Sequence, residues 1–293
     1  MPDIRTDSST PTDARRRAAL LVDLLGDDSP MVVARVRSEL ERMGKTAHPE
    51  LRRTLRFGSA RQRGRARQLL LDHARKGSVR RLIRYASRNV HDLDHALFLL
   101  DAHGAPSEDL RGFRKVLDVF ADEVLTRLSP GSVPSRILTE YLGQEVGFAG
   151  ATQDFHHPDN IYLHRGIERR TGMPLTLCAV YAFVARRAKI TAELLPFPGH
   201  VLLAIEDPSG QTILDPFAGG VEVSEARIRQ YLSQHGVPAR PEYFLPASDS
   251  LMFLRHVTNL VHSCSQRGRH SEARELSMVQ KVLQESRSLH RRG

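Results

Sequence analysis

Hydrophobic residues recur at helical spacing over the first 130 residues and follow a strand-like pattern only later. Val33, Val36 and Leu40 fall three or four positions apart, which predicts a helix that begins at Pro30 and ends at Gly44. The same spacing predicts further helices from Pro49, from Ser59 to a break at Gly77, and over residues 79–83, 93–103 and 108–128. Residues 14–130 are therefore predicted to be all-helical.

Two helix starts in this region resemble each other. Ser29 and Ser59 each stand where a helix N-cap is expected, thirty residues apart. A period of this size is typical of stacked helical hairpins. We therefore predict a HEAT-like array of two units, preceded by a disordered polar tail over residues 1–13.

The pattern changes after the Pro- and Gly-containing segment at 129–132. Helices are predicted at 134–145, 161–170 and 174–188, strands at 191–196, 200–206 and 211–215, and two helices broken near Gly268 within 249–287. The turn residues of 207–210 predict that the last two strands form an antiparallel hairpin. The predicted fold class is α+β: a helical region (14–130), a domain with a small antiparallel sheet (131–246) and a short helical C-terminal extension (247–293).

Composition excludes several classes of protein. No apolar run reaches the roughly 18–20 residues needed to cross a bilayer, and the polar N-terminus does not read as a secretory signal. Cys178 and Cys264 are too few for a disulfide framework, and no Cys/His spacing of a structural zinc site is present. We expect a cytoplasmic protein with no cofactor and no membrane contact.

Charge is concentrated in one segment. The net charge is +9, yet residues 51–90 alone contain twelve Arg and one Lys against the single acid Asp72. Arg61 and Arg65, like Arg80 and Arg84, are spaced to share a helix face. Such a surface could follow the phosphates of a nucleic acid or another polyanion, or bind an acidic protein. The alternative is a solvated helix face in an arginine-rich chain.

The residues that could carry chemistry lie in the second half. His200 and Asp215 fall on the two strands of the predicted hairpin, near the ends remote from its turn, so we expect them side by side. A carboxylate that orients an imidazole is two thirds of a Cys–His–Asp site. The third group, a thiol at a helix N-terminus, is expected near Pro174, where the 174–188 helix begins.

Several ordered motifs identify residues 140–225 as similar to the SirB-type branch of the transglutaminase-like (papain-like) superfamily. The matching segments are 145–150, 158–163, 168–177, 198–200 and 213–220, with Arg255 and Asn259-Leu260 following. Phe155 stands where the family tends to have Tyr. The resemblance implies a papain-like fold with helical repeats before it and TPR-like helices after it, here shortened to one pair.

In this resemblance Pro174 occupies the position at which active transglutaminases have their cysteine. Proline removes the thiol and also a backbone N–H of the oxyanion hole, and the loss of one such donor alone costs about 10²–10³ in rate. Three alternatives remain: Cys178 as a displaced nucleophile, Thr176 as a hydroxyl nucleophile, or a metal site of His156, His157, His200 and Asp215. Each has a simpler structural interpretation, namely a buried thiol, a hydroxyl bonded to its own helix and loop histidines.

The sequence therefore favours a transglutaminase-like pseudoenzyme, a binding or scaffold module with a protein or peptide partner. One alternative is an atypical amide hydrolase or acyltransferase that uses His200 and Asp215 with Cys178 or Thr176. The other is polyanion binding through residues 51–90.

Overall fold

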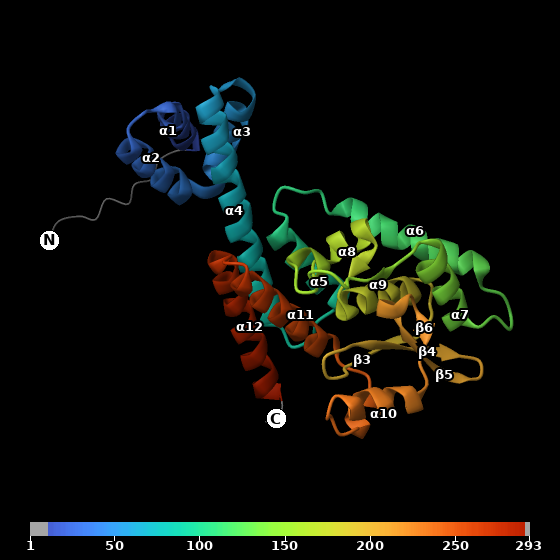
Figure 1. Cartoon of the computed structure of the whole chain (residues 1–293). Coiled ribbons are helices and arrows are strands. Elements are labelled where there is room, and N and C mark those ends of the chain that lie inside the picture. The colour runs from blue at the N-terminus through green and yellow to red at the C-terminus, as the bar shows by residue number, and fades with distance from the viewer. Residues whose placement is uncertain (1–10, 291–293) are drawn as a thin grey trace. The chain divides into compact units, whose positions relative to one another are not determined.

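The structure is a computed structural model that describes residues 11–290 (Figure 1). The chain divides into two compact units, Met1–Gly77 and Ser78–Gly293. Residues 1–10, most of the predicted disordered tail, lie outside the described residues. Residues 11–13 begin the first helix instead.

The first unit is helical, as predicted. Its elements are α1 (Pro11–Asp23), α2 (Pro30–Met43), α3 (His48–Phe57), the first part of α4 (Ala60–Ala86) and 3-10 turns at Leu24–Gly26 and Gly44–Ala47. Leu25, Leu40, Leu51 and Leu69 are fully buried in its core. The predicted break at Gly77 is wrong, because α4 continues through it. A glycine inside a helix costs only about 1 kcal/mol, which burial of residues such as Leu82 in the next turns offsets.

The second unit contains the remaining helices and both sheets. Its helices are α5 (Leu93–Gly104), α6 (Arg111–Arg127), α7 (Pro134–Leu138) with a π-helical continuation (Thr139–Glu145), α8 (Leu163–Arg169), α9 (Pro174–Arg187), α10 (Glu225–Gln234), α11 (Asp249–Gln266) and α12 (His270–His290). The sequence anticipated all of them except α10, and it did not anticipate the π-helical geometry.

Helix α9 is the centre of this unit. Every residue from Pro174 to Ala185 is buried. Helices α5, α6 and α8 contact α9, and strands β3 and β4 contact it as well. Leu97 of α5 and Leu117 of α6 share its core. Helices α5 and α6, which were predicted to belong to the N-terminal helical region, therefore pack against α9. The two compact units meet in sequence at Gly77 and Ser78, whereas the predicted boundary lay near Pro130.

A four-stranded antiparallel sheet covers one side of α9. Its strands, in sequence and spatial order, are β3 (Ala192–Leu195), β4 (Leu202–Asp207), β5 (Gly210–Asp215) and β6 (Val221–Glu222). Alternate residues of β4 point to opposite faces. Leu203 and Ile205 join the core around α9, whereas Leu202 and Ala204 join a smaller cluster with Ile228 of α10. The sheet is thus enclosed between α9 and α10, and the predicted small antiparallel sheet is confirmed.

Short elements complete the surroundings of the sheet. Strand β1 (Ala149–Gly150) pairs in parallel with β2 (Thr171–Gly172), and 3-10 turns occur at Pro158–Asn160, Pro216–Ala218 and Pro241–Phe244. None of these short elements was predicted from the sequence. Gly150 is required at its position, because a Cβ atom there would lie 2.5 Å from the ring of Phe217.

The C-terminal segment forms a helical pair. Helices α11 and α12 pack against each other, and Gly268 between them has a φ of 70°. This confirms the predicted pair and its break. None of the helices in residues 11–290 combines the length and the hydrophobicity of a membrane-spanning segment.

Candidate functional site

The structure brings His200 and Asp215 together. His200 lies just before β4, and Asp215 is the last residue of β5. The imidazole Nε2 lies 3.1 Å from Asp215 Oδ1. The two side chains keep 20% and 18% of their surface exposed, so the pair is accessible from outside the protein. The juxtaposition expected from the hairpin is the one observed.

Asp215 is fixed by its own backbone surroundings. Its Oδ1 atom also accepts a hydrogen bond from the backbone N–H of Phe217 at 3.0 Å, which caps the turn that follows β5. Its Oδ2 atom has no hydrogen bond within the described part of the chain. One carboxylate oxygen is therefore used for structure, and the other remains available as an acceptor.

His200 is held by a turn and by a guanidinium group. Gly199 has a φ of 72°, and the backbone N–H of His200 donates to Phe197 O at 3.2 Å. From α11, Arg255 Nη2 donates to the carbonyls of Phe197 and His200, both at 3.2 Å. Burial lowers the pKa of Arg255, and no carboxylate of residues 11–290 forms an ion pair with it. Arg255 thus positions the histidine turn, a role that the sequence analysis did not assign.

No nucleophile stands at the start of α9. Pro174 occupies the first helical turn and is buried. Proline offers neither a reactive side chain nor a backbone N–H. The position that the superfamily resemblance assigns to the thiol therefore supplies no group for covalent chemistry.

Cys178 lies one turn further along α9 and is fully buried. Its thiol donates to Val201 O at 3.2 Å, and no hydrogen bond joins it to the imidazole of His200. Burial, and secondly the negative charge of Asp215, raise the pKa of Cys178 well above its ordinary value. A thiol in this state is neutral and unreactive at physiological pH.

Thr176 is also fully buried. Its hydroxyl lies within hydrogen-bonding distance of two backbone carbonyls, Asn160 O at 3.0 Å and Ile161 O at 3.1 Å. The side chain therefore ties α9 to the 158–160 turn and is not directed at His200. A Thr176 nucleophile would need its hydroxyl to point toward the imidazole of His200, and these two hydrogen bonds direct it elsewhere.

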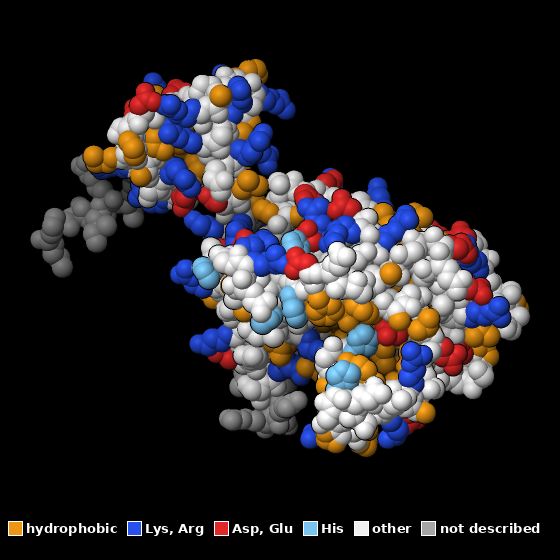
Figure 2. Space-filling model, in the orientation of Figure 1, with side chains coloured by type: hydrophobic (Ala, Val, Ile, Leu, Met, Phe, Trp, Pro, Cys, Tyr) orange, Lys and Arg blue, Asp and Glu red, His pale blue; other side chains and the backbone are white. Residues whose placement is uncertain are grey.

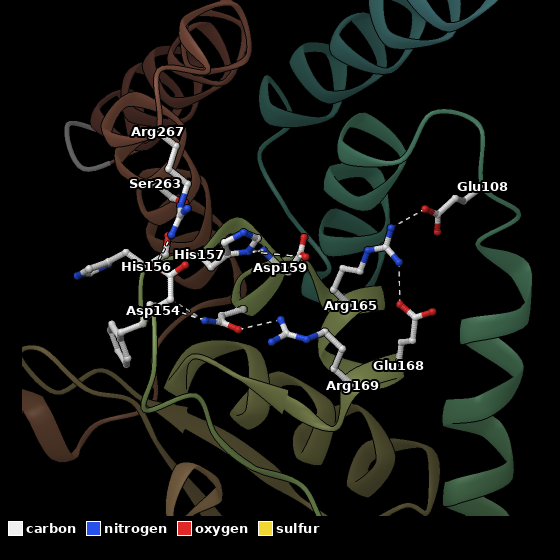
Figure 3. Close-up of polar contacts among 12 residues, drawn as sticks. Glu108, Asp154, His156, His157, Asp159, Arg165, Glu168, Arg169, Ser263 and Arg267 are labelled. Carbon is white, nitrogen blue, oxygen red and sulfur yellow. Dashed lines mark hydrogen bonds and ion pairs between the residues drawn. The ribbon is translucent and has the colours of Figure 1, made fainter. Parts of the chain in front are cut away.

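Polar contacts from several elements hold the loop before α8 (Figure 3), and Asn160 takes part in three of them. Its amide nitrogen donates to the carbonyls of Asp154 and Phe155 at 3.0 and 3.2 Å, and its side-chain oxygen accepts from Arg169 at 2.9 Å. Glu168 instead pairs with Arg165. The same loop is also bound to the C-terminal end of α11. Ser263 of α11 donates to His156 O, and Arg267, directly after α11, pairs with Asp154. Asn160 and Arg169, from the 158–163 and 168–177 segments, therefore help to fix this loop.

The ring of Phe155, in this loop, is the first of three rings in contact that end at the His200–Asp215 pair. Phe155 lies 6.0 Å from Phe217 between ring centroids, and Phe217 lies 5.9 Å from His200. Phe155 and Phe217 are both partly exposed. His156 contacts His262 of α11 at 5.3 Å instead of pointing to His200. The residues with described side chains contain no group of three or more metal-ligating residues that could hold an ion, so the metal alternative has no geometric support.

A cavity of about 210 Å³ opens beside the His200–Asp215 pair, between the sheet and α10. In the space-filling view, histidine side chains lie next to exposed hydrophobic side chains on this part of the second unit (Figure 2). The combination of an accessible polar pair and an adjoining apolar hollow is the general form of a ligand site.

The predicted basic site is only partly free. In the first unit, Arg61 pairs with Asp28, and Arg65 donates to the carbonyls of Leu25 and Asp27. In the second unit, Arg80 and Arg84 are exposed and form no ion pair with any described residue. Exposed arginines of the first unit without a carboxylate partner among residues 11–290 include Arg52, Arg56 and Arg67.

Comparison with known proteins shows the family to which the chain belongs. The family model described as the transglutaminase-like superfamily matches residues 112–258, which is half of the chain. A UPF0162 protein of Xylella fastidiosa is 32% identical over 129 residues, covering 42% of this chain and 46% of that protein. A UPF0162 protein of Haemophilus influenzae is 25% identical over 177 residues, covering 59% of this chain and 66% of that protein.

A more distant similarity extends to a eukaryotic protein. F-box only protein 21 of Mus musculus is 28% identical over 102 residues, which are 32% of this chain and 16% of that protein. This chain thus spans less than half the length of the Xylella relative and a small part of the mouse one. No solved structure matches the chain.

Proposed function

Because the chain belongs to the transglutaminase-like superfamily, we propose that its second unit is a non-catalytic binding module of the SirB-type branch. The binding site is the His200–Asp215 pair with its neighbouring cavity. The partner is a protein or a peptide segment, bound in the cytoplasm without a cofactor. In F-box only protein 21 of Mus musculus the matched segment is only 16% of the chain. This supports the proposal that the domain is a module that can be combined with other domains.

The burial of Cys178 is the observation that carries this proposal. The thiol has no exposed surface, donates to Val201 O and has a raised pKa. Pro174 supplies no nucleophile, and the Thr176 hydroxyl lies between two carbonyls. An imidazole and a carboxylate without a nucleophile can still hydrogen-bond a ligand, but they cannot form an acyl intermediate.

The test is the rate of alkylation of Cys178 between pH 6 and 9, followed by peptide mass spectrometry. Cys264 is a matched internal control because it is also fully buried. We expect both thiols to react slowly, with Cys178 unchanged by His200→Ala. Fast labelling of Cys178 at pH 6 that slows in His200→Ala would show a thiolate–imidazolium pair. That result would contradict the non-catalytic proposal and would favour the atypical amide hydrolase or acyltransferase.

A second candidate function concerns the first unit and rests on its exposed arginines. Arg52, Arg56 and Arg67 have no carboxylate partner among the described residues, so they could bind phosphates or another polyanion. The test is retention on heparin against salt. Arg52→Glu with Arg56→Glu should elute at markedly lower salt, whereas the control Arg15→Glu, which changes an arginine already paired with Glu50, should have a smaller effect. Equal elution of both variants would contradict this function.

A further inference from the structure

The cavity beside the His–Asp pair has the size of a single side chain. It lies on the face of the sheet that α10 covers and has a volume of about 210 Å³. Pockets that bury whole drug-sized ligands measure about 300–1,000 Å³. Its walls are mainly apolar and come from the strands, the loops next to them and α10: Phe197, Leu202, Val221, Val223 and Ile228. The cavity therefore suits one apolar group rather than a complete cofactor.

Two charged groups line the same cavity with unused hydrogen-bonding capacity. Arg227, in the first turn of α10, is exposed and has no ion pair with any residue of the described chain. Two positions further on, Arg229 is paired with Glu225. Asp215, which lines the same cavity, uses only Oδ1, and its Oδ2 is therefore free to accept a hydrogen bond. The lining thus combines an arginine without an ion pair in the described chain, a free acceptor and apolar side chains.

We propose that this cavity binds the C-terminal residue of a partner protein when that residue is apolar. Its side chain fills the cavity, its α-carboxylate pairs with Arg227, and its peptide N–H donates to Asp215 Oδ2. The inference rests on the proposed function, because it requires a site that binds its ligand without cleaving it. An acidic side chain would satisfy Arg227 but would leave the apolar walls unfilled.

A peptide explains more of the surface than a free amino acid derivative does. The partly exposed rings of Phe217 and Phe155 continue from His200 at centroid distances of 5.9 and 6.0 Å. Aromatic side chains provide large contact area at low conformational cost. They offer a path for the residues that precede the terminal one, which a single amino acid would leave uncovered.

The experiment uses fluorescein-labelled hexapeptide pools with five randomised positions and a fixed last residue. Leu, Phe, Ala and Asp are compared at that position, each as the free acid and as the amide, by fluorescence polarisation with the full chain. We expect the Leu or Phe acid to bind about 10- to 100-fold more tightly than the corresponding amide. Replacement of the last residue by Ala should also weaken binding about 10- to 100-fold. N-acetyl-leucine alone should compete only weakly.

Matched variants locate the binding. Arg227→Gln should remove the preference for the free acid, whereas Arg229→Gln should retain it. Val221→Trp should block the cavity from its rim, since Val221 is 43% exposed and its replacement leaves the core intact. Equal binding of acids and amides, or no binding by any pool, would overturn the inference. Mass spectrometry of the incubated pools separates the two proposals, because cleaved peptides would contradict the non-catalytic function itself.

Discussion

Two of the imidazole–carboxylate pairs in the second unit differ strongly in their surroundings. His200 Nε2 lies 3.1 Å from Asp215 Oδ1, and His164 Nδ1 lies 2.9 Å from Asp101 Oδ1. The first pair keeps about a fifth of its surface exposed and borders a cavity. The second is 2% and 0% exposed, and Asp101 also accepts the backbone N–H of His164 at 2.8 Å.

The difference separates the pair that we propose as a binding site from a pair enclosed in the core. Asp101 joins the interior of α5 to the start of α8, and burial raises its pKa despite the nearby imidazole. Asp215 lies at a strand end, where solvent can reach one of its oxygens. Proximity of His and Asp therefore does not identify a functional site. Access to the pair and an adjacent hollow distinguish His200 and Asp215.

The largest expected effect is on the buried pair. Asp101→Ala should lower the free energy of unfolding by about 3–5 kcal/mol, because it removes the carboxylate next to the buried Nδ1 of His164 and the acceptor of the His164 backbone N–H. Urea denaturation followed by circular dichroism measures this loss. Asp101→Asn is the control, since its side-chain oxygen can still accept the backbone N–H and should restore part of the stability. A loss below 1 kcal/mol in Asp101→Ala would contradict the structural role.

The buried imidazole of His256 differs from both pairs, because it has no carboxylate partner among the described residues. His256 contacts Ile161 O at 2.6 Å, and burial lowers its pKa from 6.5 to about 4. Between these two values the unfolded chain binds a proton that the folded chain does not. Stability should therefore fall as the pH drops from about 6.5 to about 4, by about 3 kcal/mol from this residue.

This pH effect is measured as the difference between variants in urea denaturation at several pH values. His256→Leu should flatten the dependence of stability on pH over this window. His262→Leu is the control, because it removes an exposed histidine from the same helix. Parallel curves for the wild type and His256→Leu would contradict a neutral, buried His256.

The smallest effect is expected at the exposed pair. Asp215→Ala removes a partly solvated contact and the cap on the Phe217 N–H, so the free energy of unfolding should fall by about 1 kcal/mol. Peptide binding should weaken at the same time. If Asp215→Ala destabilised the protein as much as Asp101→Ala does, the two pairs would be equivalent structural elements, and the comparison would fail.

Local sequence signals predicted much of the fold. The helical spacing of Val33 and Leu40, the turn residues of 207–210 and Gly268 between two helices each gave the observed element. The same hairpin predicted the contact of His200 with Asp215. Helix α10 was missed although Ser224 caps its start and Glu225 lies in its first turn. The continuation of α4 through Gly77 was missed because packing there overrides a weak local preference.

The reactive groups of the chain can be identified from its residues alone: a histidine and an aspartate on one hairpin, proline at the start of α9, and two cysteines. Which of these groups can react or bind depends on how the chain packs. Side-chain burial depends on residues far apart in sequence, so no local pattern shows that Cys178 faces Val201 O or that α10 forms a cavity against the sheet. A local pattern also cannot show that Arg255 of α11 donates a hydrogen bond to the carbonyl of His200. The chemistry of a group follows from its solvation and partners, and both of these are set by packing.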